Sequence, residues 1–140
     1  MAQPIELATH RRSTEPMSGL AAGARVSTAF LVAAAGAIHL YLWFDYFRRV
    51  HVVGPLFLVN AAGGIVLAAA LLARRSMLVV LAAGAYALGT LIAFVVSTRW
   101  GLFGYRERFW GSWQEAAGAI ELTVAILVVA LFALGRLRTR

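Results

Sequence analysis

Cysteine is absent from this chain, and charged residues are scarce. The absence of cysteine excludes disulfides, thiolate metal sites, iron–sulfur clusters and thiol redox chemistry. Only 14% of the residues are charged, whereas 61% are hydrophobic, a balance far from that of an ordinary soluble domain. A lipid bilayer is therefore the expected surrounding of most of the 140 residues.

The chain also lacks the short motifs that mark common enzymes. It has no glycine-rich phosphate loop, no HExxH pair and no Ser–His–Asp order with a nucleophile turn. No Glu-x-x-His spacing is available for a zinc or di-iron site, so no metal is expected. Bis-histidine haem is disfavoured because His39 lies in an apolar run, whereas His10 and His51 do not. Enzyme activity is the less favoured interpretation, and the cofactor is unknown.

Four apolar runs fill most of the chain, at residues 24–44, 53–73, 77–97 and 113–134. Each is close to the roughly 20 residues that a helix with ~1.5 Å rise per residue needs to cross a bilayer. The first run contains small residues that resemble a signal-peptide cleavage site, but it continues beyond them as a retained span does. We therefore expect residues 24–140 to form one four-span domain.

Residues 1–23 precede the first run. They include Pro4 and Pro16 and have no periodic apolar face. A segment that cannot bury apolar surface gains little from folding, so we expect a disordered or surface-lying cytoplasmic tail.

The links between the runs predict an all-α integral membrane four-helix bundle with antiparallel, up-down topology. Arg74-Arg75 leaves almost no slack and forces a helical hairpin. The first link, 45–52, is also short and is followed by Gly54-Pro55, a helix-start signal. The third link, 98–111, mixes aromatic and charged residues, which is typical of an interfacial anchor. The alternative is a lid over a site beneath it.

The thirteen basic residues, all arginine, give a net charge of +7. They are spread over the tail, links and C-terminus and do not form one face, so nucleic acid is not an expected partner. With the N-terminus inside, eight arginines would lie in the cytoplasm and five outside. We therefore expect a multi-pass protein of the cell membrane with both termini cytoplasmic.

Each apolar run carries one polar residue that lipid disfavours: His39, Asn60, Thr90 and Glu121. Each lies on the small-residue side of its helix, the side expected to face the bundle. Counted from the span ends, all four lie roughly 8 to 12 Å below the outer surface. Tyr86 lies one turn deeper, and Gln114 shares a stripe with Glu121. These six residues predict an outward-facing polar pocket.

The six residues do not carry equal weight. Asn60 and Thr90 can be explained by hydrogen bonds between helices, worth about 0.6 kcal/mol on average in membranes. His39 could bond a backbone carbonyl. An ionised Glu121 would cost roughly 2.5 kcal/mol or more, so we expect it to be protonated, paired with a cation or facing water. His39 is its expected partner.

Several functions fit this pocket. The first is binding of a small lipophilic or amphipathic ligand, namely a quinone, isoprenoid or lipid. The second is an accessory or assembly subunit that docks onto a larger membrane complex. The third is a proton-coupled carrier acting as a homodimer. An outer rim of charged residues could attract an anionic headgroup or be ordinary loop residues: Asp45, Arg48, His51 and Arg106.

Three segments carry a resemblance to a known group of proteins: residues 36–44, 54–58 and 101–104. They resemble small, four-span, mostly actinobacterial membrane proteins of uncharacterised function. The resemblance implies the fold and a bacterial host, and it brings no known activity.

Overall fold

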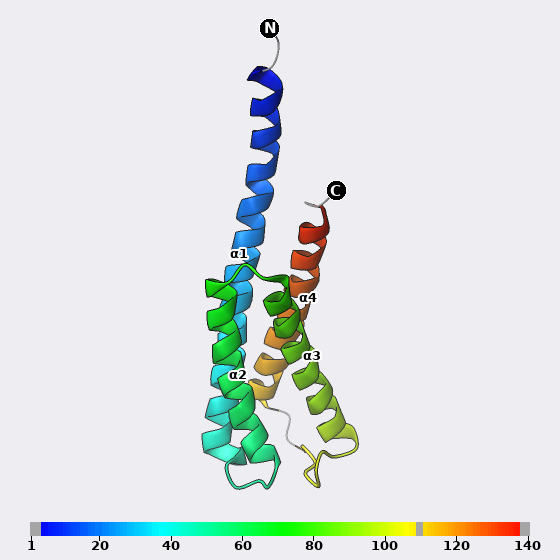
Figure 1. The fold of residues 1–140 in the computed structure, drawn as a ribbon. Coiled ribbons are helices and arrows are strands. Elements are labelled where there is room, and N and C mark those ends of the chain that lie inside the picture. The colour runs from blue at the N-terminus through cyan, green and yellow to red at the C-terminus, as the bar shows by residue number, and fades with distance from the viewer. Residues whose placement is uncertain (1–3, 109–110, 138–140) are drawn as a thin grey trace.

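A computed structural model describes the backbone of residues 4–108 and 111–137 and the side chains of residues 19–108 and 111–136. The chain is 84% helical. Its four long helices, α1 to α4 in Figure 1, are Pro4–Leu42, Val53–Ala73, Met77–Arg99 and Ser112–Leu137. All four are long and apolar enough to cross a membrane. The predicted all-α membrane bundle is therefore confirmed.

The helices alternate in direction along the chain, so the bundle has two distinct ends (Figure 1). The terminal end holds both chain termini and the α2–α3 link, and there Arg25 Nη1 donates to the carbonyl of Arg74 at 2.6 Å. The loop end holds the α1–α2 link and the longer α3–α4 link. A short π-helix, η1 (Trp43–Phe47), continues α1 toward the loop end. The up-down topology follows from this order.

Most helix boundaries agree with those expected from the sequence. α2 covers the predicted residues 53–73, α3 runs two residues past 97, and α4 begins one residue before 113. The exception is the tail, since the described backbone is helical from Pro4 and no boundary falls at Ala24. The segment is rich in helix-forming residues and adjoins a membrane helix, so its turns extend that helix without a new nucleation step. Residues 1–3 of the predicted tail lie outside the described residues.

α1 and α2 approach each other until their backbones touch. A Cβ on Gly64 would lie 2.9 Å from the carbonyl oxygen of Val32 and 3.0 Å from Gly36 Cα, and one on Gly36 would lie 3.0 Å from the carbonyl oxygen of Ala61. Without a hydrophobic force between helices in lipid, such small-residue contacts provide the packing. The expectation that small residues face the bundle is confirmed at this seam.

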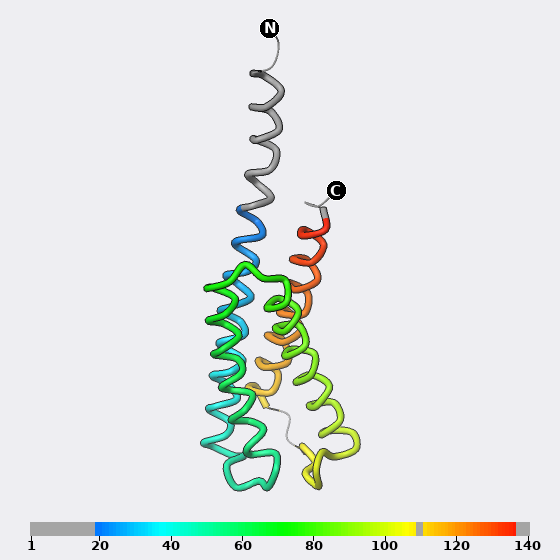
Figure 2. Tube along the Cα trace, in the orientation of Figure 1, coloured from blue at the N-terminus to red at the C-terminus, as the bar shows by residue number. Residues whose placement is uncertain are grey.

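α2 and α3 are joined by the shortest link, yet they are not the closest pair. α2 packs mainly on α1, and α3 packs mainly on α4. Figures 1 and 2 show α3 diverging from α2 toward the loop end. A short link fixes the distance between two helices only where it joins them.

The terminal half of the bundle is filled by an apolar core to which all four helices contribute. Its buried members are Ala29, Val32, Ala68, Leu71, Val80, Ala83, Ala87, Val124, Val128 and Leu131. A second cluster lies toward the loop end and consists of Ile38, Leu42, Phe47, Val53 and Ala117. The two clusters bracket the polar residues singled out from the sequence.

Candidate functional site

A cavity of about 470 Å³ lies in the loop-end half, among all four helices. His39 from α1 and Ala117 and Glu121 from α4 are among the buried residues that line it. Most of the lining is apolar. The polar lining residues are His39, Asn60, Tyr86, Thr90, Ser97, Tyr105, Glu107, Gln114 and Glu121.

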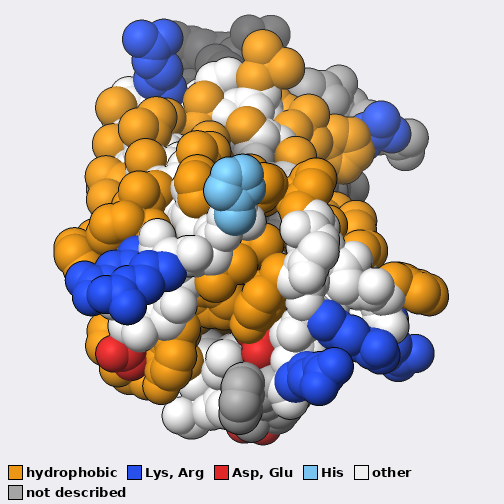
Figure 3. All heavy atoms as spheres, turned by 90° about the horizontal axis from the view of Figure 1, so that it is seen from below, with side chains coloured by type: hydrophobic (Ala, Val, Ile, Leu, Met, Phe, Trp, Pro, Cys, Tyr) orange, Lys and Arg blue, Asp and Glu red, His pale blue; other side chains and the backbone are white. Residues whose placement is uncertain are grey.

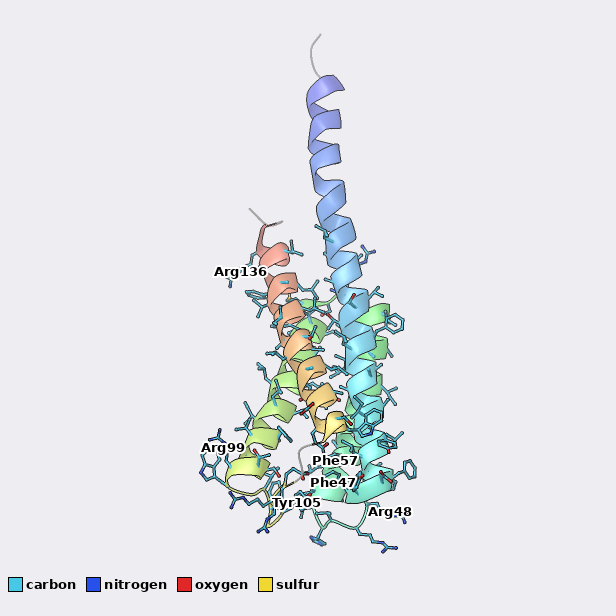
Figure 4. All side chains as sticks on the ribbon, turned by 180° about the vertical axis from the view of Figure 1, so that it is seen from behind. Phe47, Arg48, Phe57, Arg99, Tyr105 and Arg136 are labelled. Carbon is cyan, nitrogen blue, oxygen red and sulfur yellow. The ribbon has the colours of Figure 1, made fainter. Side chains whose placement is uncertain are left out.

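The six residues expected to form the pocket all line this one cavity. The four rim residues do not, although they lie at the same end of the bundle. Asp45 accepts a hydrogen bond from the Tyr41 hydroxyl at 3.2 Å, and Arg106 Nε donates to the Thr98 carbonyl at 3.3 Å. Arg48 and His51 are exposed. Seen from the loop end, basic side chains form separate groups on either side of an apolar surface (Figure 3), and Arg48 and Arg99 lie on opposite sides (Figure 4).

Asn60, Thr90 and Tyr86 form a hydrogen-bonded bridge between α2 and α3. Asn60 Nδ2 donates to Thr90 Oγ1 at 3.1 Å, and Thr90 Oγ1 donates to the Tyr86 carbonyl at 2.9 Å. The Tyr86 hydroxyl donates to the Asn60 carbonyl at 3.2 Å. Because the single Thr90 hydroxyl hydrogen goes to Tyr86, Thr90 can only accept from Asn60. The Asn60 amide nitrogen therefore faces Thr90, and its Oδ1 is left over.

His39 is buried and satisfies one ring nitrogen within its own helix. Its Nδ1 lies 2.8 Å from the Ala35 carbonyl oxygen, which can only accept, so Nδ1 carries the proton. In the neutral ring Nε2 is then an acceptor. The expected His39–Glu121 pairing is not found among the hydrogen bonds and ion pairs of the described residues.

Glu121 is 2% exposed, and its Oε1 has no hydrogen-bond partner among the described residues. In that part of the chain the only other buried side-chain atom without a partner is Asn60 Oδ1. Both residues line the cavity, and no arginine lines it. An unsatisfied buried acceptor costs about 1–3 kcal/mol, so packing alone does not account for Glu121.

Aromatic side chains close the loop end of the cavity. The rings of Phe47 and Phe57 stack at 4.1 Å with an interplanar angle of 18°, and Tyr105 meets Phe47 edge-on at 5.5 Å. Figure 4 shows these three side chains gathered at the loop end. The Phe57 ring also lies 5.2 Å from that of His39. This cap connects α1, η1, α2 and the α3–α4 link.

The described part of the α3–α4 link is shaped by a tight turn. Leu102 and Tyr105 exchange two backbone hydrogen bonds, and Phe103 and Gly104 between them both have positive φ, at 49° and 81°. This is the pattern of a two-residue type I′ turn. Leu102, Tyr105 and Glu107 all line the cavity, so the link contributes to the wall of the site. Residues 109–110 of this link lie outside the described residues.

Tyr105 and Glu107 form a polar pair within the cap. The Tyr105 hydroxyl donates to Glu107 Oε2 at 3.1 Å. Burial, followed by the neighbouring Glu107 carboxylate, raises the pKa of Tyr105 to about 12. Sequence reasoning did not select these residues or Ser97, Phe47 and Phe57 for the site. One sequence signal could have pointed to Tyr105 and Glu107. The glycines of the Gly101–Gly104 segment indicate a tight turn, which returns the chain toward the bundle.

The cavity opens sideways between α2 and α3. Leu56 and Val59 of α2 line it while remaining 42% and 67% exposed, and Gly89 of α3 lines it and is also exposed. A Cβ on Gly89 or on the cavity-lining Gly118 would meet nothing within 4 Å. These two glycines therefore leave space that a larger side chain would fill.

Fold and cavity together define a multi-pass membrane protein with a hollow, partly polar interior at one end. Among the described residues no group of three or more His, Cys, Asp or Glu side chains could hold a metal ion. No protein-family model, no curated protein and no solved structure matches this chain.

Proposed function

We propose that the protein binds a small lipophilic or amphipathic molecule in the cavity between its four helices. The observation that carries this proposal is a mostly apolar cavity of about 470 Å³ to which every helix contributes at least one predicted polar residue. Ligand sites typically measure about 300–1,000 Å³, with apolar walls and a few polar groups that orient the ligand. Quinones, isoprenoids and lipids all have this character.

The position of the opening supports entry from the bilayer. Leu56, Val59 and Gly89 lie within the membrane-spanning helices α2 and α3 and are exposed where the cavity opens. Such a mouth faces acyl chains, so a molecule dissolved in lipid can reach it without crossing water. The bridge between Asn60 and Thr90 crosses this mouth. Its hydrogen bonds hold the opening at a defined width while leaving the apolar walls free.

The orientation we propose places the loop end outside a bacterial cell membrane, with both termini in the cytoplasm. Of the thirteen arginines, seven belong to the tail, the α2–α3 link and the C-terminus, Arg25 lies beside the tail, and the other five belong to the loop end. Arginine is enriched on the cytoplasmic side of membrane proteins. The cavity then belongs to the outer half of the bilayer. The resemblance to actinobacterial four-span proteins supports the bacterial host.

Mass spectrometry of the protein after gentle extraction in a neutral detergent tests this function. We expect a discrete small molecule to remain bound at near-stoichiometric amount, and His39→Ala combined with Glu121→Gln to lower its occupancy. A homogeneous protein without any bound molecule would contradict the proposal. Co-purification with a larger membrane complex and no small molecule would favour the accessory-subunit alternative.

A further inference from the structure

We propose that the ligand of this cavity is a lipophilic amine whose ammonium group is bound by the Glu121 carboxylate. This inference rests on the proposed ligand-binding function and narrows its ligand class. Three observations support it: the polar atoms that line the cavity, the negative charge of that lining, and the positive net charge of the whole chain.

The atoms left without partners are acceptors. Glu121 Oε1 and Asn60 Oδ1 are the two buried side-chain polar atoms that have no hydrogen-bond partner in the described part of the chain. The bonds of Thr90 fix the orientation of the Asn60 amide, so Oδ1 is the free atom there. Both residues line the cavity, and an ionised Glu121 can only accept, so a head group placed beside the two residues must donate hydrogen bonds. An ammonium donates up to three, whereas a quinone or an ester carbonyl donates none.

His39 adds a further acceptor. Its Nδ1 hydrogen is used by the Ala35 carbonyl, so the neutral ring contributes only Nε2 to further bonding. His39 and Glu121 are both buried and both line the cavity, from α1 and α4. Each therefore offers an acceptor to a head group that donates hydrogen bonds.

The charge of the lining selects a cation among the possible donors. Glu121 lines the cavity, and no arginine of the described residues does. A carboxylate taken out of water is stabilised by an opposite charge, and a bound ammonium supplies one. Phe57 and Tyr86 also line the cavity, and aromatic rings attract cations that lie over their faces. Carboxylate and phosphate head groups would add a second negative charge and are disfavoured.

The positive charge of the whole chain makes a preference for amines strong evidence for a specific site. The net charge is +7, so non-specific attraction to the protein favours anionic amphiphiles and disfavours cationic ones. A protein that prefers an amine must therefore bind it at a local site that overcomes the overall charge. The buried acid at position 121 is such a site.

Three probes with one tail test the inference: decylamine, decanol and decanoate. Binding to the purified protein in neutral detergent at pH 7 is measured by native mass spectrometry at equal mole fractions of probe. We expect decylamine to bind best and decanoate least. In Glu121→Gln, which keeps the shape but loses the charge, decylamine affinity should fall about ten-fold or more, as for one lost charge-assisted hydrogen bond. Decanol affinity should change much less.

Two further variants keep the experiment decisive. Glu115→Gln removes an acid from the exposed start of α4 and should leave the ranking unchanged. Gly118→Leu fills the cavity and should reduce binding of decylamine. If Glu121→Gln does not fold, the ranking of the three probes on the unmodified protein still decides the matter.

The outcomes separate the two proposals. Equal or better binding of decanol or decanoate, lost in Gly118→Leu, would overturn the amine assignment and leave ligand binding intact. Absence of binding by all three probes, with no retained molecule in the extracted protein, would overturn both.

Discussion

The two seams of α2 differ although one helix makes both. Toward α1 the backbones touch through Gly36 and Gly64, whereas toward α3 the contact near the loop end consists of a polar bridge beside a cavity. The α1–α2 contact is the closed seam, and its two helices are joined by the longer link. The α2–α3 contact is the open seam, and its two helices have almost no link between them. In a membrane, residue size at the interface decides how close two helices come, and connectivity decides only where they meet.

This difference assigns stability to one part of the bundle and ligand binding to another. The terminal half and the α1–α2 seam hold the helices together, so the loop-end half can keep a hollow with a buried acid in it. Substitutions in the two parts should therefore differ in their effects on stability and on ligand binding.

The largest effect is expected from Gly64→Leu in the closed seam. A Cβ there would lie 2.9 Å from the Val32 carbonyl oxygen and 3.0 Å from Gly36 Cα, so the two backbones must separate. Overpacking of this kind costs about 1–3 kcal/mol or more, and we expect a large drop in the thermal midpoint in detergent. The matched change in the open seam is Gly89→Leu, where a Cβ meets nothing within 4 Å. Equal destabilisation by the two variants would break the comparison.

Glu121→Leu is expected to stabilise the ligand-free protein while abolishing ligand binding. It removes a buried acid with an unsatisfied Oε1 from an apolar environment, and such a group costs about 1–3 kcal/mol. Native proteins commonly retain such costs for function. Thermal unfolding of ligand-free protein in detergent measures the change, with Glu115→Leu as an exposed control. A lower midpoint for Glu121→Leu would mean that the acid is structural.

Thr90→Val should weaken the bridge across the open seam. Valine keeps the shape but can neither accept from Asn60 Nδ2 nor donate to the Tyr86 carbonyl. Side-chain hydrogen bonds between membrane helices average about 0.6 kcal/mol, so we expect a small drop in the thermal midpoint. The control is Thr123→Val, because exposed Thr123 bonds only the Ala119 carbonyl within its own helix. An indistinguishable effect of the two variants would show that the bridge adds nothing.

The smallest effect concerns the cap and appears only at high pH. Burial and Glu107 raise the pKa of Tyr105 to about 12, above the ordinary value of 10, so the folded protein favours the neutral phenol. The contribution of this group is therefore complete below pH 10 and is lost as the pH rises through 12. In a titration followed by tyrosinate absorbance, Tyr105→Phe should remove one of the late-titrating groups. A Tyr105 that titrates at its ordinary pKa would indicate that the cap is open.

Much of the fold followed from the sequence because the bilayer imposes simple rules. Length and apolar composition gave four spans, and Gly54-Pro55 and Arg74-Arg75 marked the ends of α2. Counting residues inward from the span ends selected four residues, helix geometry added Tyr86 and Gln114, and the structure brings all six to one cavity. A helix has a fixed rise, so depth can be counted even when neighbours are unknown.

The remainder depended on contacts between distant segments. The proposed pairing of His39 with Glu121 is not found as a hydrogen bond among the described residues, where His39 Nδ1 bonds Ala35 and Glu121 Oε1 has no partner. The Phe47–Phe57–Tyr105 cap joins three elements whose relative placement no local pattern specifies. The width of the α2–α3 seam was equally hidden, because its short link suggested close packing throughout.

Ligand occupancy of Gly118→Leu, compared with the neighbouring Ala119→Leu, tests the central claim most directly. Gly118 lines the cavity, whereas Ala119 is exposed on the same helix. Both variants can be purified in neutral detergent and examined by native mass spectrometry beside the unmodified protein. We predict that Gly118→Leu loses the bound molecule and that Ala119→Leu retains it. Equal occupancy in both variants would contradict a ligand site in the loop-end half of this bundle.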